Sequence, residues 1–343
     1  MGTHELSNCP RSTLRDRASR ALGVRPEIGI QPPGVTHGRT WNRGAVDGVE
    51  LSWGTPRTQA WLLRPAGHTG PDLPAVLLLH GHDGVKFYGK EKVADGPDGI
   101  ASGTAALRRR GYDGRSVAEG LVEAGFAVLV HDVFPWGSRR VDWQDFPARA
   151  QRAGLAFENE SERYEAAARE HEHGLAKAAI LRNMPLAGTI LREDLLALAV
   201  LRATAGIDPN RIAISGFSGG GARVVHLLTC ADVQAAVITA MMSTFEDIAD
   251  GHADDTTWAM ITPGLPAVGD WPDIAATAAP MPMLVQFAEY DSHFGIDGMR
   301  EAERALERAY TGSDSLSTEW YADRHRFSAA MQSAAARWLV DNV

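Results

Sequence analysis

The chain has 343 residues, a length at which one large α/β domain or two smaller domains can form. Hydrophobic residues make up 44% of it and charged residues 22%, which is typical of a globular protein and excludes a disordered or fibrous chain. The 34 basic and 43 acidic residues give a net charge of −9, which disfavours a nucleic-acid binder, and no apolar run is long enough for a membrane span.

The first residues of the chain and its cysteines indicate the cellular compartment in which we expect the protein. Residues 1–24 contain no apolar core of the kind that a secretory signal has. The two cysteines, Cys9 and Cys230, are too few for a disulfide framework. We therefore expect a cytoplasmic protein.

The N-terminal part predicts a short helix and then a hairpin. A polar helix is expected over residues 12–22, ending at Gly23. After a proline-bearing linker, two β-like stretches at 46–53 and 58–63 are joined by Gly54-Thr55-Pro56.

From residue 75 onwards, short apolar runs alternate with helical patterns. The runs are typical of strands that are buried on both faces of a parallel sheet, and they lie at 75–79, 126–130, 212–214, 235–242 and 282–287. The helical patterns lie at 114–124, 191–204, 220–228, 298–309 and 328–339. This alternation predicts a three-layer α/β fold with a mostly parallel sheet and helices on both faces.

Two long segments interrupt this alternation. Residues 84–113 and 137–186 are longer than ordinary connections, and the second contains a helical pattern at 158–181. We interpret both as insertions over one end of the sheet. The prediction is a single domain over residues 1–343, with an N-terminal extension of about 45 residues and these two insertions.

The pentapeptide Gly216-Phe217-Ser218-Gly219-Gly220 carries the clearest chemical signal. A strand pattern precedes it and a helix pattern follows it, so Ser218 is expected on a sharp turn at the end of a strand. Such a turn exposes the hydroxyl and requires small neighbours. We predict that Ser218 is a nucleophile.

A serine nucleophile needs an acid and a base, which follow it in that order in this architecture. Asp291 follows the apolar run 282–287 and is the predicted acid. Three other carboxylates stay open as alternatives: Glu246, Glu289 and Asp297.

The predicted base is His325, the only histidine after Phe294, and His293 is the alternative. The oxyanion is expected to bind two backbone N–H groups. One belongs to Gly219, and the other belongs to His82, with Asp83 as the alternative, in the loop His80-Gly81-His82-Asp83-Gly84.

With these motifs, residues 15–339 resemble an α/β-hydrolase of the dienelactone hydrolase and acetyl xylan esterase (cephalosporin-C deacetylase-like) group. The resemblance also includes the sequence at 131–139, HDVFPWGSR, and the sequence at 207–211, IDPNR. Acetyl xylan esterases typically have tyrosine at the position of His82, so only its backbone N–H carries over. Dienelactone hydrolases proper use cysteine where Ser218 stands, which argues against dienelactone as the substrate.

The resemblance and the triad together imply a serine esterase that acts on small acyl esters through an acyl-enzyme. Phe134, Trp136 and Phe217 are expected near the nucleophile, either lining the acyl pocket or packing in the core. No cofactor is implied, the expected partner is a small-molecule ester, and a homo-oligomer stays open. Thioesterase, acyltransferase and amidase activities are alternatives, and a non-catalytic binding module is the least favoured.

Two weaker patterns are expected to be structural. His171 and His173 are two residues apart, so they point to different sides of a helix and do not predict a metal site. Arg139 and Arg140 are expected in structural ion pairs rather than on a substrate carboxylate.

Overall fold

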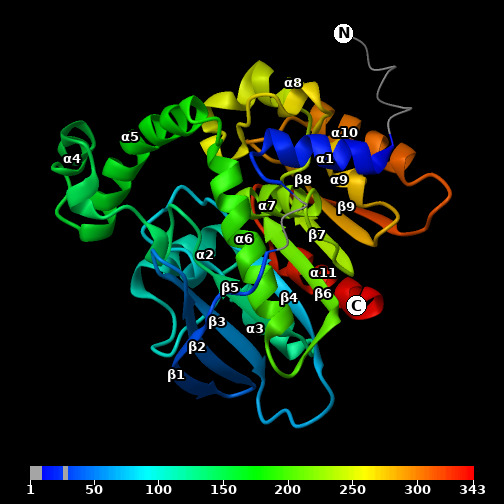
Figure 1. Ribbon diagram of the computed structural model, residues 1–343, viewed down its shortest axis with the longest axis horizontal. Helices are drawn as coiled ribbons and strands as arrows, with labels where there is room; N and C mark the ends of the chain where they lie inside the picture. Colours follow the sequence, from blue (N-terminus) through cyan, green and yellow to red (C-terminus); the bar gives the residue numbers. More distant parts are fainter. Residues whose placement is uncertain (1–9, 26–29) are drawn as a thin grey trace.

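A computed structural model describes residues 10–25 and 30–343 of the chain. Nine strands form one sheet in the order β1-β2-β3-β5-β4-β6-β7-β8-β9, and helices cover both of its faces (Figure 1). The predicted three-layer α/β fold is therefore confirmed. Cys9 and the first residues of the predicted N-terminal extension lie outside the described residues.

The sheet has an antiparallel end and a parallel main part. β1, β2, β3 and β5 pair antiparallel, and the remaining neighbours from β5 to β9 pair parallel. The strands are β1 (Thr36–Arg43), β2 (Val46–Trp53), β3 (Thr58–Pro65), β4 (Leu73–Leu79), β5 (Ala127–His131), β6 (Ile207–Phe217), β7 (Ala235–Thr239), β8 (Met283–Tyr290) and β9 (Leu316–Arg324).

The helices of the described residues include all those that the sequence predicts. They are α1 (Arg11–Ala21), α2 (Ala105–Gly111), α3 (Val117–Glu123), α4 (Ala148–Gly154), α5 (Glu160–Leu181), α6 (Leu186–Ala203), α7 (Gly219–Leu228), α8 (Phe245–Asp247), α9 (Trp271–Ala275), α10 (Ile296–Ala309) and α11 (Ala329–Asn342). Within the described ranges, no helix is both long enough and apolar enough to cross a membrane.

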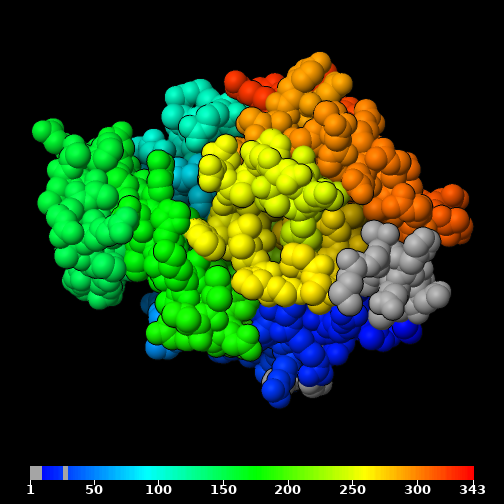
Figure 2. Space-filling view, turned by 90° about the horizontal axis from the view of Figure 1, so that it is seen from above, coloured from blue at the N-terminus to red at the C-terminus, as the bar shows by residue number. Residues whose placement is uncertain are grey.

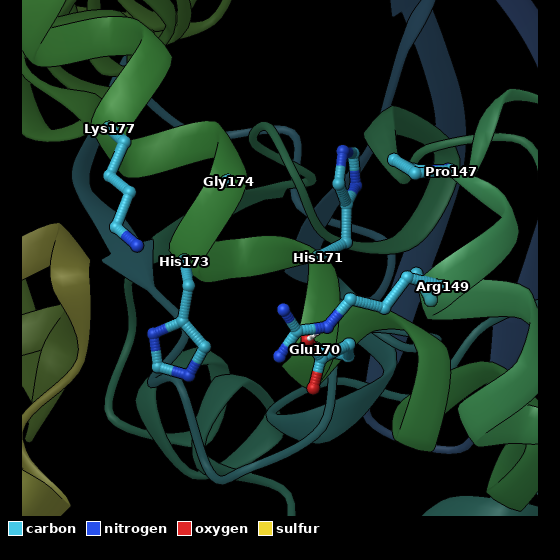
Figure 3. Close-up of a pocket in the computed structure, with 8 residues that line it drawn as sticks. Pro147, Arg149, Glu170, His171, His173, Gly174 and Lys177 are labelled. Carbon is cyan, nitrogen blue, oxygen red and sulfur yellow. Dashed lines mark ion pairs between the residues drawn. The ribbon is translucent and has the colours of Figure 1, made fainter.

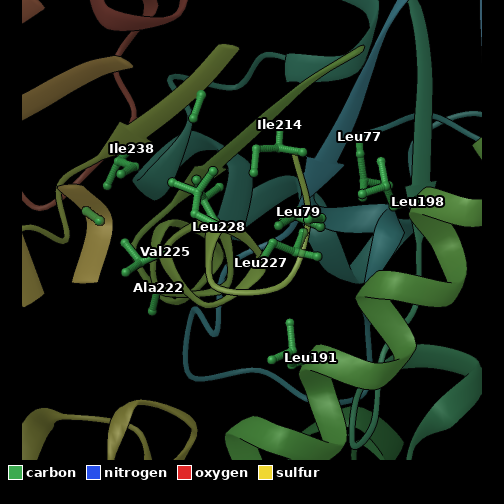
Figure 4. Close-up of a cluster of buried hydrophobic side chains, with 14 of the residues drawn as sticks. Leu77, Leu79, Leu191, Leu198, Ile214, Ala222, Val225, Leu227, Leu228 and Ile238 are labelled. Atoms are coloured by element: carbon green, nitrogen blue, oxygen red, sulfur yellow. The ribbon is translucent and has the colours of Figure 1, made fainter. Parts of the chain in front are cut away.

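Each face of the sheet has its own hydrophobic core, because side chains alternate along a strand. Leu77 and Leu79 of β4 point to the side covered by α6 and α7, where Figure 4 shows them packed near Leu198 and Leu227. Val76 of β4 points to the opposite side, which α3 and α11 cover. Burial of each such side chain stabilises the fold by about 1.5–3 kcal/mol.

The antiparallel end begins earlier than the sequence predicts. β2 and β3 form the expected hairpin, but residues 36–43, assigned to the extension, form the edge strand β1. Nearly all side chains of β1 are exposed, and its pairing with β2 shifts register between His37 and Thr40. An edge strand of this kind lacks the apolar alternation by which a strand is recognised.

The two predicted insertions lie together on one side of the molecule. α4 and α5 project from the body as an arm in Figures 1 and 2, beside the segment that follows β4. The carboxylate of Glu165 in α5 accepts the backbone N–H groups of Lys86 and Phe87, at 2.6–2.9 Å. The arm is therefore hydrogen-bonded to the segment that leaves the C-terminal end of β4.

Candidate active site

Ser218 lies on a strained turn between β6 and α7. Its backbone has φ 55° and ψ −123°, a conformation that costs energy for any residue other than glycine. A Cβ atom on Gly216 would lie 2.2 Å from the carbonyl oxygen of Gly220, and one on Gly220 would lie 2.2 Å from that of Leu79. Glycine is therefore required on both sides of Ser218 for the turn to close.

Three side chains from distant parts of the chain form a continuous hydrogen-bonded relay. Ser218 Oγ lies 2.8 Å from Nε2 of His325, and Nδ1 of His325 lies 2.6 Å from Oδ2 of Asp291. Asp291 follows β8 and His325 follows β9, so the parallel sheet brings both to the edge where β6 ends. The three predicted triad residues thus meet in one site.

The relay is held from both ends. The Asp291 side chain is completely buried, and its second oxygen accepts the backbone N–H of His293 at 2.8 Å. The ring of His325 packs against the rings of Phe217, His293 and Phe294, with centroids 4.9, 4.3 and 6.1 Å away. These contacts restrict the orientation of the imidazole.

The alternative acids and the alternative base occupy other positions. Glu246, Glu289 and Asp297 are exposed, and within the described ranges none of them is hydrogen-bonded to His325. His293 is half-buried, and this burial, followed by the neighbouring His325, lowers the pKa of His293.

Two backbone N–H groups lie beside Ser218. The nitrogen of His82 would be 3.1 Å from a Cβ atom placed on Gly219, so His82, rather than Asp83, is the loop residue that contacts the start of α7. Neither the N–H of His82 nor that of Gly219 donates to an acceptor in the part of the chain that the structure describes. Both donors are therefore free for a developing oxyanion.

The three aromatic residues expected near the nucleophile are placed differently from one another. Trp136 is 3% exposed and packs on the rings of His80 and His82. Phe217 is also 3% exposed, and its ring packs against the ring of His325. Phe134 is partly exposed. Trp136 and Phe217 therefore pack in the core, and both contact residues of the site.

Sequence reasoning missed a group of buried lysines next to the site. The chain has only four lysines, and Lys86, Lys90 and Lys92 are all less than 5% exposed. Lys86 Nζ lies 3.0 Å from Glu172 and 3.1 Å from Nε2 of His82. The only signal in the sequence is that three of four lysines fall within seven residues, in a chain that otherwise uses arginine.

A pocket of about 280 Å³ lies on the arm between α4 and α5, and no triad residue lines it. Figure 3 shows the rings of His171 and His173 on α5 pointing in different directions, with Arg149 and Glu170 forming an ion pair nearby. Nδ1 of His173 accepts a hydrogen bond from Trp258 at 2.9 Å.

Of the two arginines expected in structural ion pairs, only Arg139 forms one within residues 10–25 and 30–343. Arg139 is paired with Glu193 at 2.6 Å, and the guanidinium of Arg140 lies 4.4 Å from the ring of Phe87. No cluster of three or more metal-ligating side chains occurs in residues 10–25 and 30–343.

Comparison with known sequences gives a distant relationship. No family model matches the chain. It is 23% identical over 296 residues to YtaP of Bacillus subtilis (strain 168), a protein with a provisional hydrolase name, covering 83% of this chain and 84% of that protein.

Comparison with solved structures covers nearly the whole chain. A provisionally named acetyl xylan esterase from Bacteroides fragilis NCTC 9343 is 16% identical, with TM-score 0.67, over 91% of this chain and 74% of that one. Glucuronoyl esterase from Solibacter usitatus is 13% identical, with TM-score 0.62, over 99% and 93% of the two chains. Acetyl xylan esterase 1 from Thermoanaerobacterium sp. JW/SL YS485 is 15% identical, with TM-score 0.59, over 99% and 98%. The protein therefore has the same overall fold as these esterases.

Proposed function

We propose that the protein is a serine esterase that hydrolyses carboxylic esters of small acyl groups through an acyl-enzyme. The observation that carries this proposal is the relay from Asp291 through His325 to Ser218, with both links at hydrogen-bonding distance. A serine hydroxyl is a weak nucleophile unless a base accepts its proton, and the relay supplies that base with its tautomer fixed.

In the first half-reaction, Ser218 Oγ attacks the ester carbonyl carbon while Nε2 of His325 takes its proton. Asp291 accepts the Nδ1–H of His325 and stabilises the imidazolium that forms. The carbonyl oxygen becomes an anion, and the N–H groups of Gly219 and His82 are the donors that bind it. When this intermediate collapses, His325 returns the proton to the departing alcohol.

In the second half-reaction, His325 takes a proton from water, and the resulting hydroxide attacks the acyl carbon bound to Ser218. The same two N–H groups bind the second oxyanion. When this intermediate collapses, His325 returns the proton to Oγ of Ser218, and the carboxylic acid is released. The acid, the base and the hydrogen-bond donors of this cycle all belong to the chain itself.

The comparisons support an ester bond as the target, because the similar structures carry the names of acetyl xylan, glucuronoyl and methyl esterases. They support two kinds of ester, one with a small acyl group and one with a sugar acid as the acyl group. Two bulky rings lie close to the site, with Phe217 against His325 and Trp136 against His82, and they favour the small acyl group.

The test compares four substrates. Three are acetyl compounds that differ in their leaving group, and the fourth is an ester of a sugar acid. Nitrophenyl acetate, an acetyl thioester, acetyl nitroanilide and the methyl ester of glucuronic acid are assayed with the wild type and with Ser218→Ala. We expect the highest kcat/KM on the acetyl ester, with all turnover lost in the variant. Preference for the anilide or for the glucuronate ester would replace this proposal with an amidase or a uronoyl esterase.

A further inference from the structure

Lys92 binds the loop that carries one of the two oxyanion donors. It lies in a short 3₁₀ turn, Lys90–Lys92, and its side chain is completely buried. Nζ of Lys92 donates to the carbonyl oxygens of Gly81 and His82, each at 2.9 Å, and lies 3.7 Å from Oδ2 of Asp83. One ammonium group therefore contacts three consecutive residues of this loop.

The bond to Gly81, whose carbonyl oxygen also lies 3.0 Å from Nδ1 of His80, restrains the direction of the His82 N–H. The carbonyl of Gly81 and the N–H of His82 belong to the same peptide unit, which is trans. In a trans peptide these two groups point in opposite directions. Because Lys92 holds the oxygen, the N–H points away from Lys92, and the His82 nitrogen lies on the side of Gly219.

The charge of Lys92 also polarises this peptide. A cation at the oxygen end of an amide draws electron density toward the oxygen and leaves the N–H more positive. The effect is strong in a buried site, where water does not screen the charge. Trp136 covers the ammonium, with its ring centroid 5.8 Å from Nζ.

The backbone of Lys92 is itself held in place. Its N–H donates to the carbonyl of Gly89 at 3.1 Å, and its carbonyl accepts from Nε of the buried Arg108 at 3.1 Å. The ammonium therefore extends from a fixed point, and the loop cannot rotate without breaking its two hydrogen bonds to Nζ.

We propose that Lys92 is a positioning residue of the oxyanion hole, which orients and polarises the Gly81–His82 peptide so that the His82 N–H binds the oxyanion. This proposal rests on the proposed esterase function. Lys92 touches no substrate atom and acts only through the peptide that it holds.

The charge state of Lys92 fits this role near neutral pH. Burial lowers the pKa of Lys92 to about 8, with Lys86 and Arg223 adding to the decrease and Asp83 and Glu165 opposing it. The group is thus mostly charged at pH 7. Above pH 8 it loses the proton, and with it the charge that polarises the peptide.

The test uses Lys92→Met, with Lys90→Met as the matched control. Lys90 is equally buried but is paired with Asp132 at 2.8 Å and, in the described residues, makes no hydrogen bond to residues 80–84. We expect Lys92→Met to lower kcat on nitrophenyl acetate about 10- to 100-fold with KM changed less than about threefold, because an oxyanion interaction is lost in the transition state only. Folded Lys90→Met should keep both constants within about threefold of the wild type.

An inhibitor pair separates positioning from a general structural effect. A trifluoromethyl ketone forms an oxyanion adduct with the serine, whereas the matching methyl ketone binds without one. Lys92→Met should weaken the first by the same factor as kcat/KM and leave the second unchanged. Equal weakening of both, or kcat/KM within threefold of the wild type, would overturn the proposal.

If Lys92→Met does not fold, the wild type provides the measurement. With only four lysines in the chain, the ¹⁵N resonances of the lysine side chains can be titrated with and without the trifluoromethyl ketone. The adduct places a negative charge across the peptide from Lys92, so its titration should move to higher pH. An unchanged titration would refute the role of Lys92, whereas absence of any adduct on Ser218 would refute the esterase function instead.

Discussion

The imidazole of His293 stands edge-on to that of His325, with ring centroids 4.3 Å apart and the planes at 75°. The backbone N–H of His293 also donates to Asp291. One residue therefore contacts both His325 and Asp291 of the relay, and it holds the Asp291 carboxylate through its backbone rather than its side chain.

This arrangement predicts unequal effects of the two histidines. His293→Ala keeps the backbone hydrogen bond to Asp291 and removes only a ring that supports His325, so we expect kcat/KM to fall less than about tenfold. His325→Ala removes the base and should cost about 10⁴-fold or more. Steady-state kinetics on one activated ester measure both, and a larger loss from His293→Ala would reverse the assignment of the base.

The pKa of His293 gives a second expectation. Burial is the main cause that lowers it below the ordinary value, and the neighbouring His325 adds to the decrease. In His325→Ala both causes weaken, because the ring is removed and water gains access to its place. NMR titration should therefore show a higher pKa for His293 in that variant. A lower pKa of His293 in the variant would mean that His325 does not lower the pKa of His293 in the wild type.

Asp291→Asn should lower kcat by about 10⁴-fold with little change in melting temperature, because an amide stabilises the wrong tautomer of His325. Glu246→Gln is the matched control, since Glu246 follows the preceding strand but is exposed. We expect its kinetics to equal those of the wild type. Near-normal activity of Asp291→Asn together with an inactive Glu246→Gln would place the acid after β7.

Much of the relay is predictable from the sequence, because chain order and strand ends determine it. Ser218, Asp291 and His325 each follow a strand of a parallel sheet, so their side chains must meet at one edge. The glycines around Ser218 indicate the turn because no other residue fits there. Strand ends and glycine spacing are both visible in short stretches of sequence, so the positions of these residues can be predicted from the sequence.

The buried lysines illustrate what local patterns miss. The segment around Lys86 is charged, and a charged segment ordinarily lies in solvent. Its burial depends on Glu165 and Glu172, about 80 residues further along the chain. Likewise, the edge strand β1 is defined by its pairing with β2 and not by its own composition.

The contact between Lys86 and Glu172 predicts an acid-sensitive link between the arm and the site. Burial alone would raise the pKa of Glu172, but its contacts with His82 and Lys86 lower the pKa from 4.5 to about 2. A carboxylate whose pKa is lower in the folded protein than in the unfolded protein stabilises the fold fully above its unfolded-state pKa. This stabilisation is lost as the pH falls from about 4.5 toward 2.

We expect Glu172→Gln to reduce the free energy of unfolding at pH 7 by roughly 3 kcal/mol, since a buried lysine then loses its charged partner. Glu170→Gln is the control on the same helix, because Glu170 pairs with the exposed Arg149 and should cost less than about 1 kcal/mol. Urea unfolding of both variants at pH 7 and at pH 3 provides the measurement. Equal losses for the two variants at pH 7 would contradict a buried link.

The proposed small acyl pocket predicts a graded preference for chain length. On nitrophenyl esters with acyl groups of two to twelve carbons, kcat/KM should be highest from acetyl to butyryl. Each methylene in an apolar pocket changes discrimination by only about 1–3 kcal/mol, so the decline should be gradual. A maximum at eight carbons or more would instead indicate a long acyl groove.

Covalent labelling shows whether Ser218 is the nucleophile. The wild type and Ser218→Ala are treated with a fluorophosphonate, with Ser292→Ala as a control for an exposed serine near the site. Intact-mass and peptide mass spectrometry then locate the adduct. We expect one phosphonyl group on Ser218 in the wild type and in Ser292→Ala, and none in Ser218→Ala. An unmodified wild type, or an adduct that persists in Ser218→Ala, would show that Ser218 is not the nucleophile.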